Sequence, residues 1–413
     1  MERKKYKVLM LADHALSTSG VGTQSRHLIN GLLKKGGWSF RQFGAAIKHD
    51  NYDTIVVNED FIIKPVDGFG NPDMLRVTLA TEKPDVLLLF TDPRFFIWTW
   101  EMEDEIHQIC PIAYWHVWDN RPTPRFNDAL YESTDLINCH SHLTYEMVKE
   151  NFPEKTNFVP HALPEDLYFP LGNVAKKSYR RQLLGNDKAD HFIAFWMNRN
   201  AKRKRPNDVL LSWQKFMQQL EKQGKKDALL IMHTDPNDSE GPNLQQTAEM
   251  LGIQESVLFS NQRVDFEKIN IMHNIADVTL NISFAEGFGL GTLESMQCGT
   301  PIIAAKTGGL TRQVVDHRDG SENGVALPIA ARSLVGSQQV PYIYEDYASI
   351  DDTAEALIKM YSLNPEERKN LSEKVRSYVM SEFNYQDTID MWDESLRDLI
   401  DNWNRDKFTL ETM

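Results

Sequence analysis

A glycine-rich segment constrains the fold of this chain more than any other feature. Residues 284–301 read FAEGFGLGTLESMQCGTP and place Glu286 and Glu294 eight positions apart. The apolar run at 278–282 that precedes the segment is typical of a buried strand. Gly299, followed by threonine and proline, is typical of the end of a short helix. The segment therefore predicts a tight bend between the carboxyl end of a strand and the start of a helix.

This bend predicts a binding site for an anion. N–H groups at the start of a helix have no partner within the helix, and the helix dipole places partial positive charge there. The groups concerned belong to Gly287, Phe288, Gly289 and Leu290. Because such groups bind phosphate well, we expect a diphosphate at this bend.

Length and composition set the class of protein. The chain has 413 residues, enough for two domains. An apolar fraction of 41% and a charged fraction of 25% are typical of a soluble globular protein, and no apolar stretch is long enough for a membrane helix. The net charge of −14 gives no general attraction to nucleic acid. Three isolated cysteines and the lack of an apolar leader favour a cytoplasmic location without a disulfide framework or zinc site.

Apolar runs alternate with helical segments along most of the chain, a rhythm typical of parallel α/β sheets. The predicted strands are 8–12, 86–90, 112–115, 136–139, 192–197, 229–232, 257–259, 278–282 and 302–305. A proline-rich stretch, 159–170, separates the two groups of strands and suits a connection between domains. We therefore expect domains at 1–170 and 187–384, with a terminal helix at about 385–413 packing back near the first.

The string from Glu286 to Leu290, continued by Glu294, residues 298–304 and the pair Gly308-Gly309, closely resembles the donor-site signature of glycosyltransferase family 4. The resemblance spans most of the chain and is strongest in residues 190–325. It implies the GT-B fold, with two Rossmann-like, doubly wound parallel-sheet domains facing a central cleft. It also implies transfer of a sugar from a nucleoside diphosphate sugar with retention of the anomeric configuration.

The resemblance assigns the diphosphate to two basic residues, Arg199 and Lys204, without an obligatory metal ion or other cofactor. Arginine can bind phosphate with two parallel hydrogen bonds, and lysine adds a point charge. Positive charge placed there would stabilise the departing phosphate in the transition state. The alternative is that residues 202–205, Lys-Arg-Lys-Arg, form only a solvated basic turn.

The two carboxylates receive different roles from the resemblance. Glu294 would accept hydrogen bonds from the nucleotide ribose, and Glu286 would contact the hydroxyl groups of the donor sugar. One alternative is that both only favour a helix start through its dipole. Another makes them the acid and nucleophile of a glycosidase, but a hydrolase needs no phosphate site.

The remaining candidate residues lie at strand ends and loops. The resemblance includes Asn198 among the substrate-binding residues and places backbone groups near Arg263 and Val264 beside the base. His116 ends a predicted strand, where cleft residues lie in open α/β sheets. The resemblance implies that it contacts the donor sugar, and the alternative is a packed histidine in an aromatic cluster.

Gly20 and Gly22 imitate a dinucleotide-binding fingerprint, but seven residues separate Ala12 from Gly20 and no acidic residue ends the second strand. We instead expect this loop to approach the phosphate or sugar of the donor and to lead into a helix at 23–35 that Gly36 terminates.

The sequence thus predicts a retaining glycosyltransferase that uses a UDP- or GDP-linked sugar. The acceptor is left open among a glycan, a small molecule and a modified nucleic acid, and the oligomeric state is also open. Alternatives are a viral-type enzyme that glycosylates DNA bases, a non-catalytic protein that binds sugar nucleotides, and an epimerase.

Overall fold

The computed structural model describes residues 3–404, and these form two compact α/β units. The first unit holds the described residues up to Ala162, the segment Gly336–Ile343 and the residues from Tyr385 onward. The second unit holds Leu163–Val335 and Tyr344–Asn384. Each unit is built around its own sheet.

The first unit contains an eight-stranded sheet in the order β3-β4-β2-β1-β5-β6-β7-β8. All neighbouring strands pair in parallel except β3 and β4, which are antiparallel. The strands are β1 (Tyr6–Asp13), β2 (Trp38–Ala45), β3 (Ile55–Asn58), β4 (Phe61–Pro65), β5 (Val86–Thr91), β6 (Ile112–His116), β7 (Leu136–Cys139) and β8 (Thr156–Phe158). The central strands β1, β5 and β6 are buried almost throughout, as expected where helices cover both faces of a parallel sheet.

Seven α-helices accompany this sheet in the described part of the chain. They are α1 (Gly20–Lys35), α2 (Pro72–Glu82), α3 (Ile97–Trp100), α4 (Glu103–His107), α5 (Asp128–Glu132), α6 (His142–Lys149) and α15 (Tyr385–Asn402). Helix α1 begins where the Ser19 side chain accepts a hydrogen bond from the Gly22 N–H group, and it ends at Gly36 with φ of 84°. Gly36 therefore terminates the helix as predicted, but the helix begins at Gly20, three residues before the predicted start.

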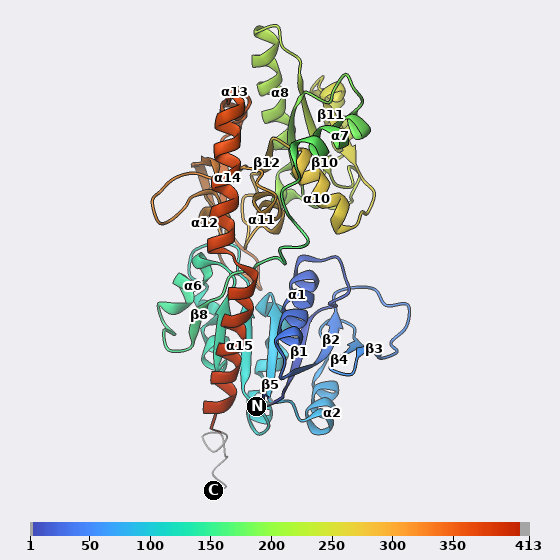
Figure 1. Cartoon of the computed structure of the whole chain (residues 1–413). Helices are drawn as coiled ribbons and strands as arrows, with labels where there is room; N and C mark the ends of the chain where they lie inside the picture. Colours follow the sequence, from blue (N-terminus) through green and yellow to red (C-terminus); the bar gives the residue numbers. More distant parts are fainter. Residues whose placement is uncertain (1–2, 405–413) are drawn as a thin grey trace. The chain divides into compact units, whose positions relative to one another are not determined.

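Helix α15 completes the core of the first unit, although its residues come from the end of the chain. Ile389, Trp392 and Leu396 are buried with residues of β1, α1 and β6. The hydroxyl group of Tyr385 donates a hydrogen bond to the carbonyl oxygen of His27 in α1, at 2.6 Å. Figure 1 shows α15, in red, running beside this sheet. The part of the predicted terminal helix beyond residue 404 lies outside the described residues.

The second unit contains a six-stranded parallel sheet in the order β11-β10-β9-β12-β13-β14 and a separate two-stranded sheet, β15-β16. The strands are β9 (Phe192–Met197), β10 (Ala228–His233), β11 (Val257–Ser260), β12 (Val278–Asn281), β13 (Ile302–Ala305), β14 (Gly324–Leu327), β15 (Ile329–Val335) and β16 (Ile343–Ala348). The predicted strands at 192–197 and 302–305 have the observed bounds.

Helices lie on both faces of this sheet. They are α7 (Asn173–Leu184), α8 (Pro206–Lys222), α9 (Leu244–Met250), α10 (Phe266–Ile275), α11 (Leu290–Gln297), α12 (Leu310–Val314), α13 (Ile350–Ser362) and α14 (Pro365–Glu382). One core joins the sheet to α8, α9 and α13, and a second joins it to α10, α11, α12 and α14. The unit is therefore doubly wound, and the α/β architecture predicted from the sequence is confirmed.

Three further observations concern the sequence predictions. The units divide between Ala162 and Leu163, within the stretch 159–170 that we expected to connect the domains, and α7 lies between the expected domain limits at 170 and 187. The domain limits given from the sequence remain predictions. The three cysteines are buried and unbonded to each other. Between residues 3 and 404, no helix has the length and apolar character needed to cross a membrane.

Candidate functional site

The glycine-rich bend lies in the second unit, between β12 and α11. Gly289 precedes α11 with φ of 92°, a left-handed conformation that favours glycine. A second loop, which follows β13, packs directly on the bend: the Gly309 N–H group donates to the carbonyl oxygen of Glu286 at 3.0 Å. A Cβ atom at Gly309 would lie 2.5 Å from the carbonyl oxygen of Gly287 and from Cα of Phe288. Glycine at 309 is therefore needed for the two loops to meet.

A buried glutamine fixes the backbone of the bend. The Gln313 side chain donates to the carbonyl oxygens of Phe288, at 2.7 Å, and Gly289, at 3.2 Å, and accepts from the Thr292 hydroxyl group at 2.6 Å. The backbone carbonyl oxygen of Gln313 in turn accepts a hydrogen bond from the Asn323 side chain at 2.8 Å. The carbonyl groups of the bend thus point into the protein, where buried partners satisfy them.

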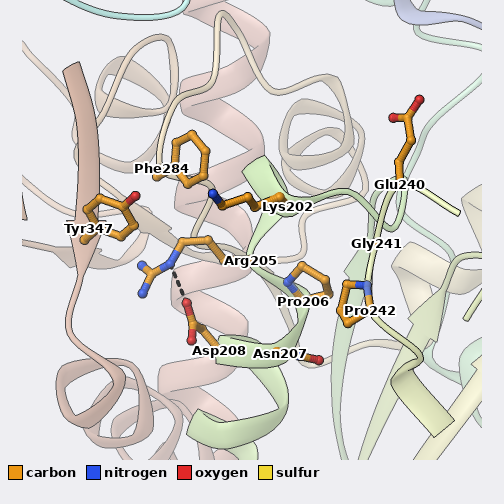
Figure 2. A pocket seen from close by; sticks show the side chains of 10 residues that line it. All are labelled: Lys202, Arg205, Pro206, Asn207, Asp208, Glu240, Gly241, Pro242, Phe284 and Tyr347. Atoms are coloured by element: carbon orange, nitrogen blue, oxygen red, sulfur yellow. Dashed lines mark hydrogen bonds and ion pairs between the residues drawn. The ribbon is translucent and has the colours of Figure 1, made fainter. Parts of the chain in front are cut away.

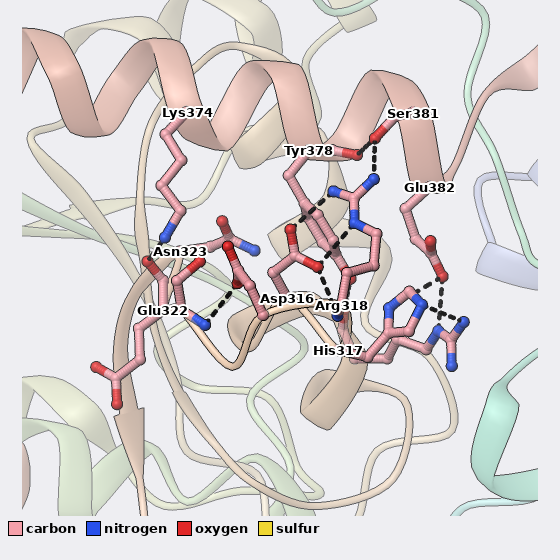
Figure 3. A network of polar contacts seen from close by, with 12 residues as sticks. Asp316, His317, Arg318, Glu322, Asn323, Lys374, Tyr378, Ser381 and Glu382 are labelled. Atoms are coloured by element: carbon pink, nitrogen blue, oxygen red, sulfur yellow. Dashed lines mark hydrogen bonds and ion pairs between the residues drawn. The ribbon is translucent and has the colours of Figure 1, made fainter.

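A polar network then ties the loop around Asn323 to helix α14 (Figure 3). Arg318 binds both carboxylate oxygens of Asp316, at 2.8 and 2.7 Å, and donates to the Ser381 hydroxyl group at 3.0 Å. Lys374 donates to the carbonyl oxygen of Glu322 at 2.6 Å. Helix α14 therefore supports the loop that positions Gln313, and through it the bend.

Glu286 meets two basic side chains that lie 82 and 83 positions before it in the sequence. The ammonium group of Lys204 forms an ion pair and hydrogen bond with its Oε2 atom, and the Arg203 guanidinium lies 3.6 Å from Oε1. Arg203 also donates to the carbonyl oxygen of Ala285 at 2.7 Å, and the Ser283 hydroxyl lies 3.4 Å from Oε2. Because Glu286 is only 8% exposed, these cations compensate a carboxylate that has lost most of its water.

The charge balance shifts the titration of Glu286. Burial alone would raise its pKa, but Lys204 and then Arg203 outweigh burial and hold the pKa at about 2. Since this value lies below the ordinary 4.5 of glutamate, the folded protein favours the ionised form. The stabilisation is fully present above the ordinary pKa and is lost as the pH falls toward the folded value.

We therefore expect Glu286→Gln to lower the unfolding midpoint near neutral pH, with a difference from the unmodified protein that stays constant down to about pH 5 and shrinks below about pH 4. Thermal unfolding of both proteins across this range measures the difference. Asp351→Asn, at an exposed carboxylate of the same unit, is the control. A difference that grows as the pH falls would contradict the assignment.

Arg199 is not brought to this pair. Its guanidinium lies 2.9 Å from a carboxylate oxygen of Asp238 and 3.0 Å from one of Glu240, and its side chain is 59% exposed. In this structure the loop between β10 and α9 offers two carboxylates that attract the arginine. The predicted binding of one diphosphate by Arg199 and Lys204 together remains a prediction.

Glu294 lies in the second turn of α11 and contacts α10. Its Oε2 atom is 3.2 Å from Nε2 of His273, whose side chain is fully buried, whereas the Glu294 side chain is 13% exposed. A small part of the Glu294 side chain thus remains accessible to solvent. Its predicted contact with a ribose remains a prediction.

The other predicted residues of the second unit lie on neighbouring loops. Asn198 follows β9 directly, and Arg263 and Val264 lie between β11 and α10, where Arg263 is exposed. The Phe288 side chain, by contrast, is 5% exposed and packs against the ring of Phe383, so only its backbone is available for a ligand. The predicted backbone role of the bend is compatible with this packing.

The predicted residues of the first unit have local structural explanations. A Cβ atom at Gly22 would lie 2.2 Å from Oγ of Ser17 and 2.5 Å from the carbonyl oxygen of His14. Close packing within the protein therefore requires glycine at position 22, and the predicted approach of this loop to the donor remains a prediction. Gly20 is the first residue of α1.

His116 is fully buried at the end of β6, where its ring stacks on Tyr114 and its Nε2 atom lies 2.7 Å from the hydroxyl oxygen of Tyr131. Burial, with a smaller contribution from His140, lowers its pKa well below the usual 6.5, so the ring is neutral. This environment matches the alternative of a packed histidine in an aromatic cluster, and a contact with the donor sugar remains a prediction.

Sequence reasoning missed two contributors to the site. Arg203 was visible only as one member of the basic turn, and nothing in its spacing indicated a contact with Glu286. Asp346 in β16 is 1% exposed, accepts from Thr307 at 2.9 Å and Arg332 at 2.6 Å, and donates through its N–H group to the Phe284 carbonyl oxygen at 2.7 Å. No motif marks this aspartate, because its partners come from three separate segments.

The family comparison covers the unit that contains the bend. Residues 180–378 match the model of the family described as glycosyl transferases group 1. These residues form a glycosyl transferase group 1 domain. The match includes the Lys204–Glu286 pair, Glu294 and the two glycine loops.

Curated relatives of the group 1 domain are glycosyltransferases and a glycosyl-malate synthase by name. A D-inositol 3-phosphate glycosyltransferase of Segniliparus rotundus is 29% identical over 169 residues, which are 41% of this chain and 35% of the relative. An N-acetyl-alpha-D-glucosaminyl L-malate synthase of Bacillus anthracis is 25% identical over 277 residues, 65% of this chain and 61% of the relative. The matched regions span less than two thirds of either relative.

Solved structures extend the likeness from the group 1 domain to almost the whole chain. Sucrose-phosphate synthase of Thermosynechococcus elongatus matches with a TM-score of 0.75 at 16% identity, covering 97% of this chain and all of that one. The Anabaena protein HepE, in complex with UDP-glucose, matches with a TM-score of 0.68 at 16% identity, covering 95% and 100%. These likenesses establish the fold, which is the GT-B fold with two Rossmann-like units, as predicted.

Proposed function

We propose that this protein is a retaining glycosyltransferase of family 4, which transfers a sugar from a UDP- or GDP-linked donor to an acceptor hydroxyl group. The observation that carries the proposal is the meeting of Lys204 and Arg203 with Glu286 at the glycine bend. Fixed cations and backbone N–H groups at one place suit a diphosphate, and a buried carboxylate suits sugar hydroxyl groups. The group 1 domain and its relatives support the same chemistry.

In the proposed reaction the bond between the anomeric carbon and the diphosphate oxygen breaks, and the acceptor oxygen bonds to the same face of the sugar. The acceptor proton passes to the departing phosphate. Lys204 and the N–H groups at the start of α11 would stabilise the charge that develops on this phosphate. Because protein cations supply this charge, we also propose that no metal ion is obligatory.

The direct test is incubation with a panel of UDP- and GDP-sugars, with release of the nucleoside diphosphate as the readout. A transferase is expected to release the nucleoside diphosphate slowly when water replaces the acceptor. If no metal ion is obligatory, this release should be the same with and without the chelator EDTA. The anomeric form of the first product, followed by NMR, tests retention. A donor that is epimerised without release of the nucleoside diphosphate would instead indicate an epimerase. Binding of the sugar nucleotide without either reaction would indicate a non-catalytic sugar-nucleotide sensor.

Replacing Glu294 provides a prediction for binding alone. Glu294→Ala is expected to weaken binding of the preferred nucleoside diphosphate by about 10- to 100-fold, because a hydrogen bond to a charged group contributes about 1.5 to 3 kcal/mol. Isothermal calorimetry with UDP and GDP measures the change. Glu249→Ala in α9, at an exposed glutamate of the same unit, is the control. Binding that is unchanged in Glu294→Ala would refute the ribose contact.

A further inference from the structure

A cavity lies beside the bend, within the second unit, and none of the predicted site residues lines it. Its volume is about 360 Å³, within the range of small-molecule sites, about 300 to 1,000 Å³. Its wall comes from the basic turn, the start of α8, the loop before α9, the bend and β16 (Figure 2). The lining residues are Lys202, Arg205, Pro206, Asn207, Asp208, Glu240, Gly241, Pro242, Phe284 and Tyr347.

Two aromatic rings form an apolar corner of this cavity. The ring centroids of Phe284 and Tyr347 are 5.5 Å apart, and the ring planes are inclined by 40°. Nothing flat fits between rings at this spacing, since stacked rings need about 3.5 to 4 Å on each side. The corner therefore offers a surface against which one face of a ligand can pack, rather than a slot for an aromatic base.

The corner is rigid because both aromatic residues are held by their neighbours. The Phe284 N–H group donates to the carbonyl oxygen of Arg203 at 3.1 Å, and its side chain is 8% exposed. The Arg205 guanidinium lies 5.2 Å from the Tyr347 ring centroid and donates to the carbonyl oxygen of Ala348 at 3.0 Å. A surface that is already ordered costs a ligand little conformational entropy.

The charges around the cavity cancel. Lys202 and Arg205 carry two positive charges, and Asp208 and Glu240 carry two negative charges. Arg205 is already paired with Asp208 at 2.7 Å, and Glu240 with Arg199 at 3.0 Å. An anion at the start of α8 would therefore meet the Asp208 carboxylate, so the cavity suits a neutral ligand better than a phosphate.

A neutral ligand with one apolar face and many hydroxyl groups fits these features best. A pyranose ring presents C–H groups on its faces, which can pack on the aromatic corner, and hydroxyl groups around its edge. Those hydroxyl groups can donate to carboxylate oxygens and accept from the Lys202 ammonium group, which is exposed. The chemistry of the wall is thus that of a saccharide site.

We propose that this cavity binds a neutral saccharide, at a site separate from that of the nucleotide sugar. The binding itself does not depend on the proposed function. The role that we assign to it does: in a glycosyltransferase, the cavity would hold a sugar unit of a saccharide acceptor. The acceptor class then narrows from glycan, small molecule or nucleic acid to a saccharide.

Ligand-observed saturation-transfer NMR tests the proposal with the full chain. The probes are methyl α-glucoside, methyl α-mannoside, methyl α-galactoside, N-acetylglucosamine, maltose and cellobiose. At least one is expected to bind, and Tyr347→Ala is expected to weaken that binding at least 10-fold, because it removes half of the aromatic corner. Tyr347→Phe is the matched variant, which keeps the ring and loses only the hydroxyl group, and it should retain binding.

Binding of UDP and GDP, measured by calorimetry, separates this inference from the proposed function. Saccharide binding that Tyr347→Ala abolishes, with nucleotide binding unchanged, supports the cavity. A protein that binds nucleotide but none of the saccharides overturns this inference and leaves the proposed function standing. Saccharide binding without nucleotide binding would leave this inference standing and overturn the proposed function.

Two further outcomes would also overturn the inference. One is saccharide binding that is equal in Tyr347→Ala and the unmodified protein, since the ligand would then lie elsewhere. The other is loss of nucleotide binding in a folded Tyr347→Ala, since the cavity would then belong to the nucleotide site. If Tyr347→Ala does not fold, Lys202→Ala replaces it, because this exposed side chain can be shortened without disturbing the core. Saccharide binding that is unchanged in Lys202→Ala would then count against the cavity.

Discussion

Lys204→Met is expected to lower the rate of sugar-nucleotide cleavage by about 10²- to 10³-fold, the loss typical when one fixed group that stabilises transition-state charge is removed. It is also expected to destabilise the second unit by about 3 to 5 kcal/mol. This cost arises because Glu286, which is 8% exposed, would keep its charge without its closest cation. Release of the nucleoside diphosphate measures the rate, and urea unfolding measures the stability.

A second substitution separates the two effects of Lys204→Met. In Lys204→Met/Glu286→Gln the buried charge is gone, so most of the stability should return while the reaction stays slow. Lys222→Met, at an exposed lysine near the end of α8, is the control and should leave both quantities unchanged. Full activity in Lys204→Met would refute the assignment of this residue to the diphosphate.

Trp392→Ala is expected to lower the free energy of unfolding of the first unit by about 3 to 5 kcal/mol, the usual cost of removing a large buried aromatic side chain. Trp392 has no exposed surface, and its ring centroid is 4.8 Å from that of Trp115 in β6. The substitution would leave a cavity between α15 and the sheet. Urea unfolding, followed by circular dichroism, measures the loss.

The neighbouring residue provides the control for Trp392→Ala. Met391 lies on the same helix but is 42% exposed, so Met391→Ala should change stability by less than about 0.5 kcal/mol. If the two substitutions cost the same, α15 would not be part of the folded core of the first unit. A change in stability that is small for both substitutions would lead to the same conclusion about α15.

The sequence predicted the central strands well because both faces of a parallel sheet are buried. Runs such as 86–90 and 192–197 are continuously apolar, and they match β5 and β9. Strands β3, β4, β8, β14, β15 and β16 were not predicted. β3 has four residues, three of them exposed, so its local pattern does not differ from that of a loop. Such strands form because the sheet beside them offers hydrogen-bonding partners.

The candidate site was predictable where backbone geometry decides it and not where side chains choose partners. The strand, bend and helix around Glu286 follow from glycines and apolar runs, and the structure has them in that order. The direction of Arg199 depends on Asp238 and Glu240, about forty residues away, and no local pattern encodes that choice. His116 is an intermediate case, because its ring stacks on Tyr114 of the same strand but its hydrogen-bonding partner Tyr131 comes from α5.

The close packing of Gly309 on the bend limits how the donor preference of the proposed enzyme could be redesigned. Even one added carbon at Gly309 would force the loop after β13 away from the bend. Most variants of a library that varies this position would therefore be misfolded or destabilised. Diversity is better introduced at Arg263, which is exposed on a separate loop. The bend and the loop after β13 then keep their packing.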